Sequence, residues 1–310
     1  MLDNAELEKL VETSDEWIVS RTGIRERRII AAQEATSDLA ITSGRRALEE
    51  AGLAATDLDL IIVATVTPDK LIPSTASFVQ KGLGAVNAVG FDLAAACSGF
   101  SFALSVAHRF VESGVYRHVL VCGIDTMSTV TDYTDRNSCI LFGDGGGAAI
   151  VGPGDGGHVL VDHQLGLDGS GVDLLHIPAG GSRTPATIDS VEAKDHTLKM
   201  TGPKVFAFAV EKLVTTVRDL LTRNGYTLDD LGLLVPHQAN LRIVEAGAKR
   251  LKLDMDRIYL NLERFGNTGA GSVPLALDEA QRAGRLEKGQ LVIIVAFGAG
   301  LTWGATLIRW

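Results

Sequence analysis

Cysteine, histidine and aromatic residues are all scarce in this 310-residue chain, which has 3 cysteines, 7 histidines and 5% aromatic residues. The cysteines, Cys97, Cys122 and Cys139, stand at irregular spacings, which do not indicate a disulfide framework or a CxxC metal site. No apolar run approaches a membrane span, and the amino terminus lacks the basic start and apolar stretch of a secretory signal. We therefore expect a cytoplasmic protein with free thiols and no metal site.

The chain also has fewer basic than acidic residues: 29 lysine and arginine residues against 38 aspartate and glutamate residues, which gives a net charge of −9. Such an acidic chain is not expected to bind nucleic acid or anionic membranes broadly, although a local basic patch can still hold a phosphate group. Hydrophobic residues, at 46%, and 34 glycines are abundant, which is typical of a globular protein with tight turns and backbone-lined pockets. The length suffices for two domains or one large duplicated fold.

Short β-branched runs alternate with helix-length amphipathic segments, a pattern that predicts an α/β layered fold. A turn-rich break at residues 152–157 separates two parts, and FGDGGGAAIVG in the first is similar in character to FGAGLTWGATLI in the second. We infer a pseudo-duplicated fold with halves 1–155 and 156–310 and an active site between them. The predicted strands are residues 60–67, 118–126, 146–152, 231–236, 291–297 and 302–310, and the predicted helices include 97–113, 203–224 and those starting at 241 and 273.

Cys97 follows a strand-like segment and three alanines, and it precedes a long apolar helix. Unpaired N–H groups at a helix amino terminus favour thiolate, so we expect the pKa of this thiol to be lowered. Small neighbours such as Ala96, Ser98 and Gly99 leave room for a thioester carbonyl. A buried structural cysteine is the commoner fate of an isolated cysteine, and only the partner motifs favour catalysis over that alternative.

Two further motifs supply an imidazole and a carboxamide. His237, in PHQAN, follows a buried strand and opens a helix, whose dipole disfavours imidazolium, so we expect a neutral ring that donates through Nε2. Asn267, in GNTGAG, stands in a glycine-rich loop, and its amide can stabilise a developing oxyanion. Taken singly, each residue could instead serve a cap or a turn. Together with a thiol they form the parts of an acyl-thioester enzyme.

Other conspicuous residues are interpreted as structural. Cys122 and Cys139 lie among strand-type apolar residues and are expected in the core. The glycine-rich FGDGGGAAI lacks the GK[ST] ending of a P-loop and is interpreted as a turn between strands. The remaining histidines are interpreted as surface or turn residues: His108, His118, His158, His163, His176 and His196.

Taken in order, the motifs resemble β-ketoacyl-acyl-carrier-protein synthase III of the thiolase-like superfamily. The resemblance covers nearly the whole chain and rests on SDEWIVSRTGIRERR, DLAAACSGF, TDRNSCILFGDGGGAA, LVPHQANLRI, GNTGAGSVP and AFGAGLTWG. It implies a thiolase-like αβαβα fold, a homodimer and the initiating condensation of bacterial-type fatty-acid synthesis. An acyl-CoA primer would acylate the enzyme, and decarboxylative condensation with malonyl-acyl-carrier protein would give 3-oxoacyl-carrier protein, CoA and CO2. No metal or other cofactor is implied.

The resemblance assigns the catalytic roles. Cys97 would be the acylated nucleophile, and His237 with Asn267 would support malonyl decarboxylation. Phe297 would shield the malonyl carboxylate from water. Backbone N–H groups of Cys97 and Ala299 would form the oxyanion hole; the family usually has glycine at the latter position, and alanine should serve there if its φ angle allows.

The resemblance also assigns contacts with the two substrates. The residues matched to coenzyme A contacts are Trp17, Arg21, Arg136 and Asn240. Those matched to the surface that meets the acidic carrier protein are Gln238, Arg242, Lys249 and Arg250. Core packing for the tryptophan and a solvated helix face for the basic residues are the structural alternatives.

Two features depart from the family pattern. Related synthases usually carry a further strand and a glycine-containing turn before LDNAELEKL. A chain without that strand would have an exposed sheet edge. Either the sequence starts too late, or the protein is a variant with lowered stability. Ile72 occupies the region that bounds the primer pocket across the dimer interface, where a bulky aromatic favours very short primers. Because isoleucine is shorter, longer or branched primers are predicted to fit.

Other functions remain open at this point. A polyketide-type synthase or transacylase of the same fold would use the same thiol, imidazole and carboxamide. A degradative thiolase needs a second cysteine near the carboxyl end, and none follows Cys139. A papain-like hydrolase also orders Cys, His and Asn, but its local cysteine signature is absent. A catalytically impaired module that binds acyl-CoA or carrier protein is the non-enzymatic alternative.

Overall fold

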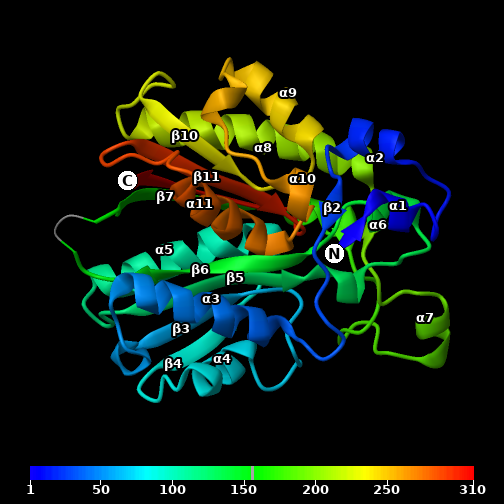
Figure 1. Cartoon of the computed structure of the whole chain (residues 1–310), viewed down its shortest axis with the longest axis horizontal. Helices are drawn as coiled ribbons and strands as arrows, with labels where there is room; N and C mark the ends of the chain where they lie inside the picture. The colour runs from blue at the N-terminus through cyan, green and yellow to red at the C-terminus, as the bar shows by residue number, and fades with distance from the viewer. Residues whose placement is uncertain (155–156) are drawn as a thin grey trace.

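The computed structural model describes residues 1–154 and 157–310. Figure 1 shows two stacked sheets with a pair of helices between them and further helices on each outer face, the five-layer α/β arrangement that the sequence predicts. The inner pair is α5 (Gly99–Glu112) and α11 (Ser272–Arg282). The outer helices are α3 (Thr36–Ala51) and α4 (Thr75–Leu83) on one side and α8 (Gly202–Arg223) and α9 (Leu241–Leu251) on the other.

The two sheets repeat one scheme. The first has the order β4 (Val89–Leu93), β3 (Leu60–Ala64), β5 (Val119–Thr126), β6 (Asp144–Val151). The second has the order β10 (Leu231–Pro236), β11 (Leu291–Gly298), β12 (Thr302–Arg309), β7 (Val159–Leu167). The last two strands of each half pair antiparallel with each other. These pairs are β5 with β6 in the first half and β11 with β12 in the second. The predicted duplication is therefore visible in the strand pairing.

Alternation along the strands explains the layers. Ile61 and Val63 of β3 pack with α3 and α4, whereas Leu60 and Ile62 pack with the inner helices. Successive side chains of a strand point to opposite faces, so strands that are apolar throughout are covered on both sides. In the second sheet, Ile293 belongs to the cluster under α8 and α9, and its neighbours 292 and 294 belong to the inner cluster.

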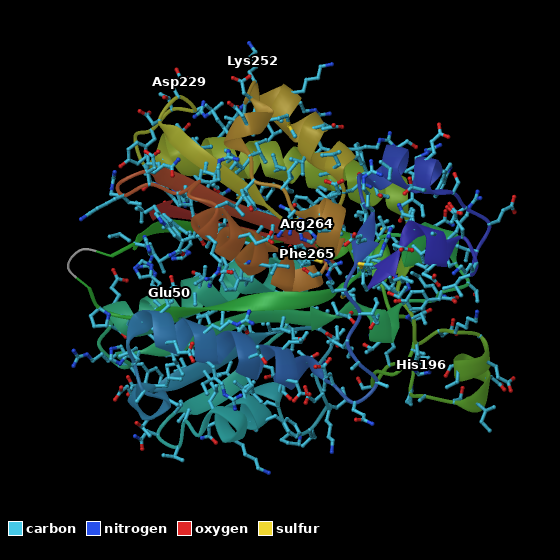
Figure 2. All side chains as sticks on the ribbon, viewed as in Figure 1. Glu50, His196, Asp229, Lys252, Arg264 and Phe265 are labelled. Carbon is cyan, nitrogen blue, oxygen red and sulfur yellow. The ribbon has the colours of Figure 1, made fainter. Side chains whose placement is uncertain are left out.

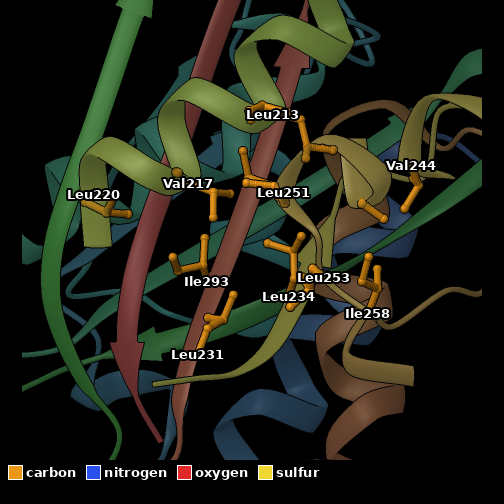
Figure 3. Close-up of a cluster of buried hydrophobic side chains, with 14 of the residues drawn as sticks. Leu213, Val217, Leu220, Leu231, Leu234, Val244, Leu251, Leu253, Ile258 and Ile293 are labelled. Carbon is orange, nitrogen blue, oxygen red and sulfur yellow. The ribbon is translucent and has the colours of Figure 1, made fainter. Parts of the chain in front are cut away.

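Figure 3 shows the outer cluster of the second half. Leu213 and Val217 of α8 and Leu251 of α9 point toward Leu234 and Ile293 of the sheet. Each of these side chains is buried. Burying an aliphatic side chain contributes about 1.5–3 kcal/mol relative to leaving it exposed, so this cluster holds α9, which follows the predicted histidine, firmly on the sheet.

One glycine-rich motif differs from the prediction. FGDGGGAAI is not a turn between strands, because residues 144–151 form β6. A Cβ on Gly146 would lie 2.1 Å from the carbonyl oxygen of Gly123, and one on Gly147 would lie 3.1 Å from Pro274. The glycines therefore let β6 lie close to β5 and to α11. The predicted break at residues 152–157 and the boundary between the halves include residues 155 and 156, which lie outside the described part of the chain.

The shorter elements gather at one end of the sheets, on the right in Figure 1. The fully buried Arg27 joins three of them, because it donates to Asn4 Oδ1 at 2.6 Å and to the carbonyl oxygen of Ile140. These elements are β1 (Leu2–Asp3), α1 (Asn4–Leu7), α2 (Asp15–Thr22), β2 (Glu26–Arg27), α6 (Arg136–Cys139), β8 (Leu175–His176), α7 (Ile188–Glu192) and β9 (Lys199–Met200). A further short helix, α10 (Leu262–Phe265), precedes the asparagine loop.

The outer edges of the two sheets differ. β7 pairs antiparallel with β12 from Val159 to Leu167. In the first sheet β6 takes the corresponding edge position. Within residues 1–154 and 157–310, no strand pairs with its outer side. The predicted core positions of Cys122 and Cys139 are confirmed, since both are 0% exposed. None of the described helices is long and apolar enough to cross a membrane.

Candidate active site

A cavity of about 730 Å³ opens beside the inner helices and collects residues from both halves. It brings together the thiol, imidazole and carboxamide that stand far apart in the sequence. Of the predicted site residues, those that line it are Cys97, His237, Asn267, Phe297, Ala299, Trp17, Arg21, Asn240 and Arg242. A pocket of this size with a few convergent polar groups is typical of a ligand site.

Cys97 lies in a 3₁₀ turn, η2 (Ala96–Ser98), immediately before α5. The turn is tied to the second sheet, because Ser98 Oγ donates to Thr302 Oγ1 at 2.8 Å. The expected fall in the pKa of the thiol is wrong: burial, and to a smaller extent the nearby carboxylate of Asp125, raises the pKa of Cys97 to about 12. Desolvation disfavours the thiolate more strongly here than the helix terminus favours it. The thiol is therefore protonated at neutral pH.

His237 follows β10 directly and is 2% exposed. It precedes α9 by four residues, so it stands before that helix and does not open it. Burial lowers the pKa of the imidazole to about 3, which confirms the predicted neutral ring and identifies desolvation as the cause. Its Nδ1 lies 2.6 Å from Ser272 Oγ, and its ring meets the edge of Phe297 at 5.5 Å between centroids. With Nδ1 occupied, Nε2 is the atom left for a substrate.

Asn267 is held by its own backbone and by the turn that follows it. Its N–H donates to the carbonyl oxygen of Leu141 at 2.8 Å, and its carbonyl oxygen accepts from Gly143 N–H at 3.0 Å. The side-chain Oδ1 accepts from Gly269 N–H at 3.0 Å. Because the amide oxygen is engaged, Nδ2 is the donor that remains for the cavity.

The end of β11 approaches the cysteine turn closely. A Cβ on Gly298 would lie 2.7 Å from the Cys97 nitrogen, so glycine is required at this position. Ala299 follows and lines the cavity. It is not among the non-glycine residues that adopt positive φ within the described chain, so its side chain imposes no such strain. The backbone there can serve an oxyanion with alanine in place of glycine.

Trp17 and Arg21 line the cavity, and Arg136 joins them in a cationic aromatic cluster without being one of the lining residues. The guanidinium carbons of Arg21 and Arg136 lie 5.7 Å and 5.1 Å from the centroid of the Trp17 ring. The tryptophan is half-buried: it packs against an apolar core cluster and also lines the cavity. A ring flanked by two cations suits a planar, phosphorylated ligand.

The residues around α9 divide into two groups. Asn240 caps the helix, with Oδ1 accepting from Arg242 N–H at 2.9 Å and Nδ2 donating to the Arg21 carbonyl at 3.1 Å. The basic residues Arg242, Lys249 and Arg250 are exposed on the helix. Lys252 extends this basic surface at the end of α9 and projects into solvent in Figure 2.

Gln238 differs from its predicted place at the carrier-protein surface. It is 1% exposed, and its amide donates to the Pro236 carbonyl while Oε1 accepts from Asn261 N–H at 3.0 Å. The side chain therefore braces the loop after β10 and is closed to a docking protein. Ile72, by contrast, is 87% exposed and does not line the cavity of the single chain.

Some residues near the site were missed from the sequence. Ser272, which contacts His237, stands in GNTGAGSVP, and only its presence in that motif could have pointed to it. His108 and His163 are half-buried, and their rings hydrogen-bond at 2.9 Å between α5 and β7, a contact that the surface interpretation did not predict. His196 does lie away from the sheets, beside α7 in Figure 2. In the described part of the chain, no group of three or more His, Cys, Asp or Glu residues could hold a metal ion.

The chain is similar to known proteins over its whole length. Residues 91–169 match the family described as 3-oxoacyl-[acyl-carrier-protein (ACP)] synthase III, and residues 221–310 match the family described as its C terminal. The chain is 53% identical over 310 residues to the β-ketoacyl-[acyl-carrier-protein] synthase III of Caldanaerobacter subterraneus subsp. tengcongensis, covering 100% of this chain and 94% of that protein. The corresponding enzyme of Clostridioides difficile is 51% identical, covering 99% and 94%.

A solved structure agrees with these matches. The crystal structure of 3-oxoacyl-[acyl-carrier-protein] synthase III from Aquifex aeolicus has a TM-score of 0.92 at 41% identity, covering 100% of this chain and 95% of that one. This similarity confirms the predicted thiolase-like fold. The chain therefore belongs to the β-ketoacyl-acyl-carrier-protein synthase III family, the condensing acyltransferases that initiate fatty-acid synthesis.

Proposed function

We propose that this chain joins an acyl-CoA primer to malonyl-acyl-carrier protein through an acyl-enzyme on Cys97. The observation that carries the proposal is that Cys97, His237 and Asn267 line one cavity, although they come from opposite halves of the chain. The two thioester substrates would use this cavity in turn. Every step uses protein groups and the substrates, and neither a metal nor a redox cofactor takes part.

In the first step the Cys97 sulfur attacks the thioester carbonyl of acyl-CoA. The bond to the CoA sulfur breaks, the new thioester forms on Cys97, and the thiol proton ends on the departing CoA. The high pKa of the resting thiol means that this proton must leave as the attack occurs. Backbone N–H groups of Cys97 and Ala299 would stabilise the tetrahedral oxyanion, an effect worth about 2.7–4 kcal/mol per donor in known enzymes.

In the second step malonyl-carrier protein loses CO2 beside His237 and Asn267. His237 Nδ1 and Ser272 Oγ share a hydrogen bond. With the serine hydroxyl as its donor, the imidazole proton stays on Nε2 for the thioester oxygen of the malonyl group. Asn267 Nδ2 donates to the same oxygen and stabilises the enolate. Phe297, against the His237 ring, makes the surroundings of the carboxylate apolar and so favours its loss. The carbanion attacks the acyl-Cys97 carbonyl, the bond to the Cys97 sulfur breaks, and the released thiolate takes a proton from solvent.

Both substrates would enter from the side of α2 and α9. The adenine and phosphates of CoA fit the cluster of Trp17, Arg21 and Arg136. The pantetheine arm would pass Asn240, which lines the cavity. Arg242, Lys249 and Arg250 would attract an acidic carrier protein, because exposed basic residues steer a partner of opposite charge. We place the enzyme in the cytoplasm, where these substrates meet.

We also propose a homodimer. The edge strand β4 exposes Val89 at 51% and Phe91 at 36%, and the loop before α4 exposes Leu71 at 88% and Ile72 at 87%. An edge strand with exposed apolar side chains is a ready surface for pairing. In such a dimer, Ile72 would bound the primer pocket of the partner, and its size would admit longer or branched primers.

The proposal is tested by the intact mass of the protein after incubation with acetyl-, isobutyryl-, butyryl- and octanoyl-CoA. We expect an adduct of one acyl group that is lost in Cys97→Ala and kept in the matched variant Cys122→Ala, since Cys122 is a core residue. Adding malonyl-carrier protein should discharge the adduct as 3-oxoacyl product. Sedimentation of the same sample reports whether a dimer forms.

The alternatives give different results in this experiment. A folded wild type that binds acyl-CoA without an adduct would contradict the synthase and leave the binding module. Release of free acid would indicate a hydrolase. An acyl-enzyme that reacts with malonyl-CoA but not with malonyl-carrier protein would indicate a polyketide-type synthase.

A further inference from the structure

Asp125, near the end of β5, is a buried carboxylate that the proposed mechanism does not use. It is 0% exposed and, among the described residues, it is not one of those that line the cavity. Its hydrogen-bond partners are all neutral donors. Burial raises the pKa of this carboxyl, and its hydrogen-bond donors oppose that rise. An ionised carboxylate inside a protein is costly unless several donors satisfy it. Each oxygen of Asp125 faces a backbone N–H, which can only donate, so the geometry favours the ionised form.

One oxygen of Asp125 holds the loop that follows β3. Oδ1 accepts from Thr65 Oγ1 at 2.9 Å, from Val66 N–H at 2.8 Å and from Thr67 Oγ1 at 3.0 Å. Val66 lines the cavity beside Cys97. This oxygen therefore fixes one wall of the cavity within the first half of the chain.

The other oxygen of Asp125 contacts the second half of the chain. Oδ2 accepts from Ala270 N–H at 2.7 Å, in the 3₁₀ turn η6 (Gly269–Gly271). The first residue of that turn, Gly269, donates to Asn267 Oδ1 at 3.0 Å, and the residue after it, Ser272, contacts His237 Nδ1 at 2.6 Å. The carboxylate thus fixes the η6 turn, which contacts the side chains of both Asn267 and His237 through Gly269 and Ser272.

We propose that Asp125 is a positioning residue for the condensation half-reaction, whose carboxylate holds the η6 turn so that Asn267 and His237 face the thioester on Cys97. The proposal rests on the roles proposed above for these three residues. Asp125 acts through the turn and touches no substrate. A small displacement of the turn would misplace two hydrogen-bond donors at once, and misplacement by about 1 Å can slow an enzyme about a hundredfold.

The charge of Asp125 has a second, opposite effect on the nucleophile. It contributes to the raised pKa of the Cys97 thiol, because a nearby negative charge disfavours thiolate. Removing the charge should therefore ease acylation of Cys97, while releasing the turn should slow condensation. A residue that only stabilises the fold would not separate the two half-reactions in this way.

Asp125→Asn is a sharp test because each carboxylate oxygen faces a backbone N–H, that of Val66 on one side and that of Ala270 on the other. The hydroxyls of Thr65 and Thr67 can rotate to accept, but a backbone N–H cannot. An asparagine must place its NH₂ group against one of them. Since three donors surround Oδ1, the amide oxygen should stay there and the NH₂ group should oppose Ala270.

The chain offers a matched control in Asp92. Its Oδ2 accepts from Thr75 N–H at 2.6 Å and its Oδ1 from Ala76 N–H at 2.8 Å. Asp92→Asn therefore creates the same mismatch with a backbone N–H at the start of α4, away from the cavity. Thr65→Val is a milder companion, because it removes one donor from Asp125 and keeps the carboxylate.

The experiment separates the half-reactions in single-turnover measurements. Acylation of Cys97 by acyl-CoA is followed by intact mass across pH, and the preloaded acyl-enzyme is then mixed with malonyl-carrier protein to measure CO2 release. For Asp125→Asn we expect CO2 release to fall about a hundredfold, with acylation retained and its pH profile moved to lower pH. Thr65→Val should show a smaller loss confined to CO2 release. Asp92→Asn should leave the pH profile in place and should not slow CO2 release relative to acylation.

Other outcomes would overturn the proposal. Asp125→Asn that slows both steps equally, or leaves both unchanged with the pH profile in place, would show that the carboxylate does not position the turn. Should Asp125→Asn fail to fold, equal slowing of both steps in Thr65→Val leads to the same conclusion. Absence of the adduct in the wild type would instead refute the proposed role of Cys97, which Cys97→Ala monitors in parallel.

Discussion

The two inner helices begin alike but carry different chemistry. Each follows a 3₁₀ turn, η2 before α5 and η6 before α11, and the two turns pack against each other. The first residue of each turn has positive φ, +47° at Ala96 and +56° at Gly269. The duplicated fold therefore supplies the same backbone bend twice, and one copy presents a thiol while the other presents an amide and a serine.

The surroundings of the two turns explain why one has alanine and the other glycine. Ala96 lines the cavity, so its methyl group has space. A Cβ on Gly269 would lie 2.2 Å from Asp125 Oδ2. Positive φ is tolerated by alanine at a moderate cost, but overlap with a fixed carboxylate is not. The η6 turn thus requires glycine at position 269 for two reasons, its positive φ and the nearby carboxylate of Asp125.

Each helix is also anchored to the opposite half by a polar contact of its own. On α5, His108 Nδ1 meets His163 Nε2 at 2.9 Å, and His163 Nδ1 meets Thr306 Oγ1 of β12 at 3.0 Å. The η6 turn is held by Asp125 of β5. The two anchors respond differently to acid, because the histidine pair is formed by neutral rings whereas the η6 turn is held by a carboxylate.

Gly269→Ala should have the largest effect on condensation and stability. The added methyl group would push against Asp125 and displace the turn that holds Asn267. We expect CO2 release from malonyl-carrier protein to fall about a hundredfold and unfolding free energy to fall by about 1–3 kcal/mol. Single-turnover kinetics and urea denaturation measure the two effects.

The matched control for Gly269→Ala is Ala96→Gly. It relieves the positive φ at the first turn and increases the freedom of the unfolded chain, so we expect a net stability change within about 1 kcal/mol. Condensation should persist in this variant. Equal losses in the two variants would show that both turns are limited by backbone conformation alone.

The histidine anchor should make stability depend on pH. Burial first, and then the charge of His108, lowers the pKa of His163 to about 4. Below the unfolded pKa of about 6.5, the unfolded chain binds a proton that the folded chain refuses, so the free energy of unfolding falls as pH drops from there toward 4. The neutral pair is fully stabilising above that range.

His163→Gln tests this dependence. We expect the variant to lose less stability than the wild type between pH 6.5 and 5, by about 1–2 kcal/mol, in urea titrations at several pH values. His237, whose pKa is lowered to about 3, contributes in both proteins and cancels in the difference. Parallel pH curves for the two proteins would mean that His163 can be protonated within the fold.

The comparison also shows which parts of the molecule local sequence can predict. Strands such as β10, residues 231–236, matched their predicted bounds, because a run of branched apolar residues between turns specifies its own structure. The members of the site were predicted because a rare thiol, an imidazole and a carboxamide each stood in a distinctive motif. A strand was predicted at residues 146–152, but the start of β6 at Asp144 was not, because the glycine-rich segment was interpreted as a turn.

The pKa values of the site residues were harder to predict from the sequence than the identities of those residues. A helix terminus is visible in a sequence, so the thiol of Cys97 was expected to have a low pKa. The depth of burial and the carboxylate of Asp125, 28 positions away in the chain, appear only after folding, and they reverse the sign. Ser272 was missed for the same reason, since its contact with His237 joins residues 35 positions apart.

The smallest expected effect lies at the end of β11, where Gly298 and Ala299 make a second contrast. Glycine is required at the first position by the backbone of Cys97, whereas Ala299 has no positive φ. In the proposed mechanism Ala299 acts through its N–H alone. Ala299→Gly should therefore change the rate of Cys97 acylation by less than about threefold, equivalent to under about 0.7 kcal/mol. Gly298→Ala, measured beside it, should abolish acylation, because its methyl group would enter the space of the nucleophile. A large loss in Ala299→Gly would mean that the alanine methyl group itself shapes the oxyanion site.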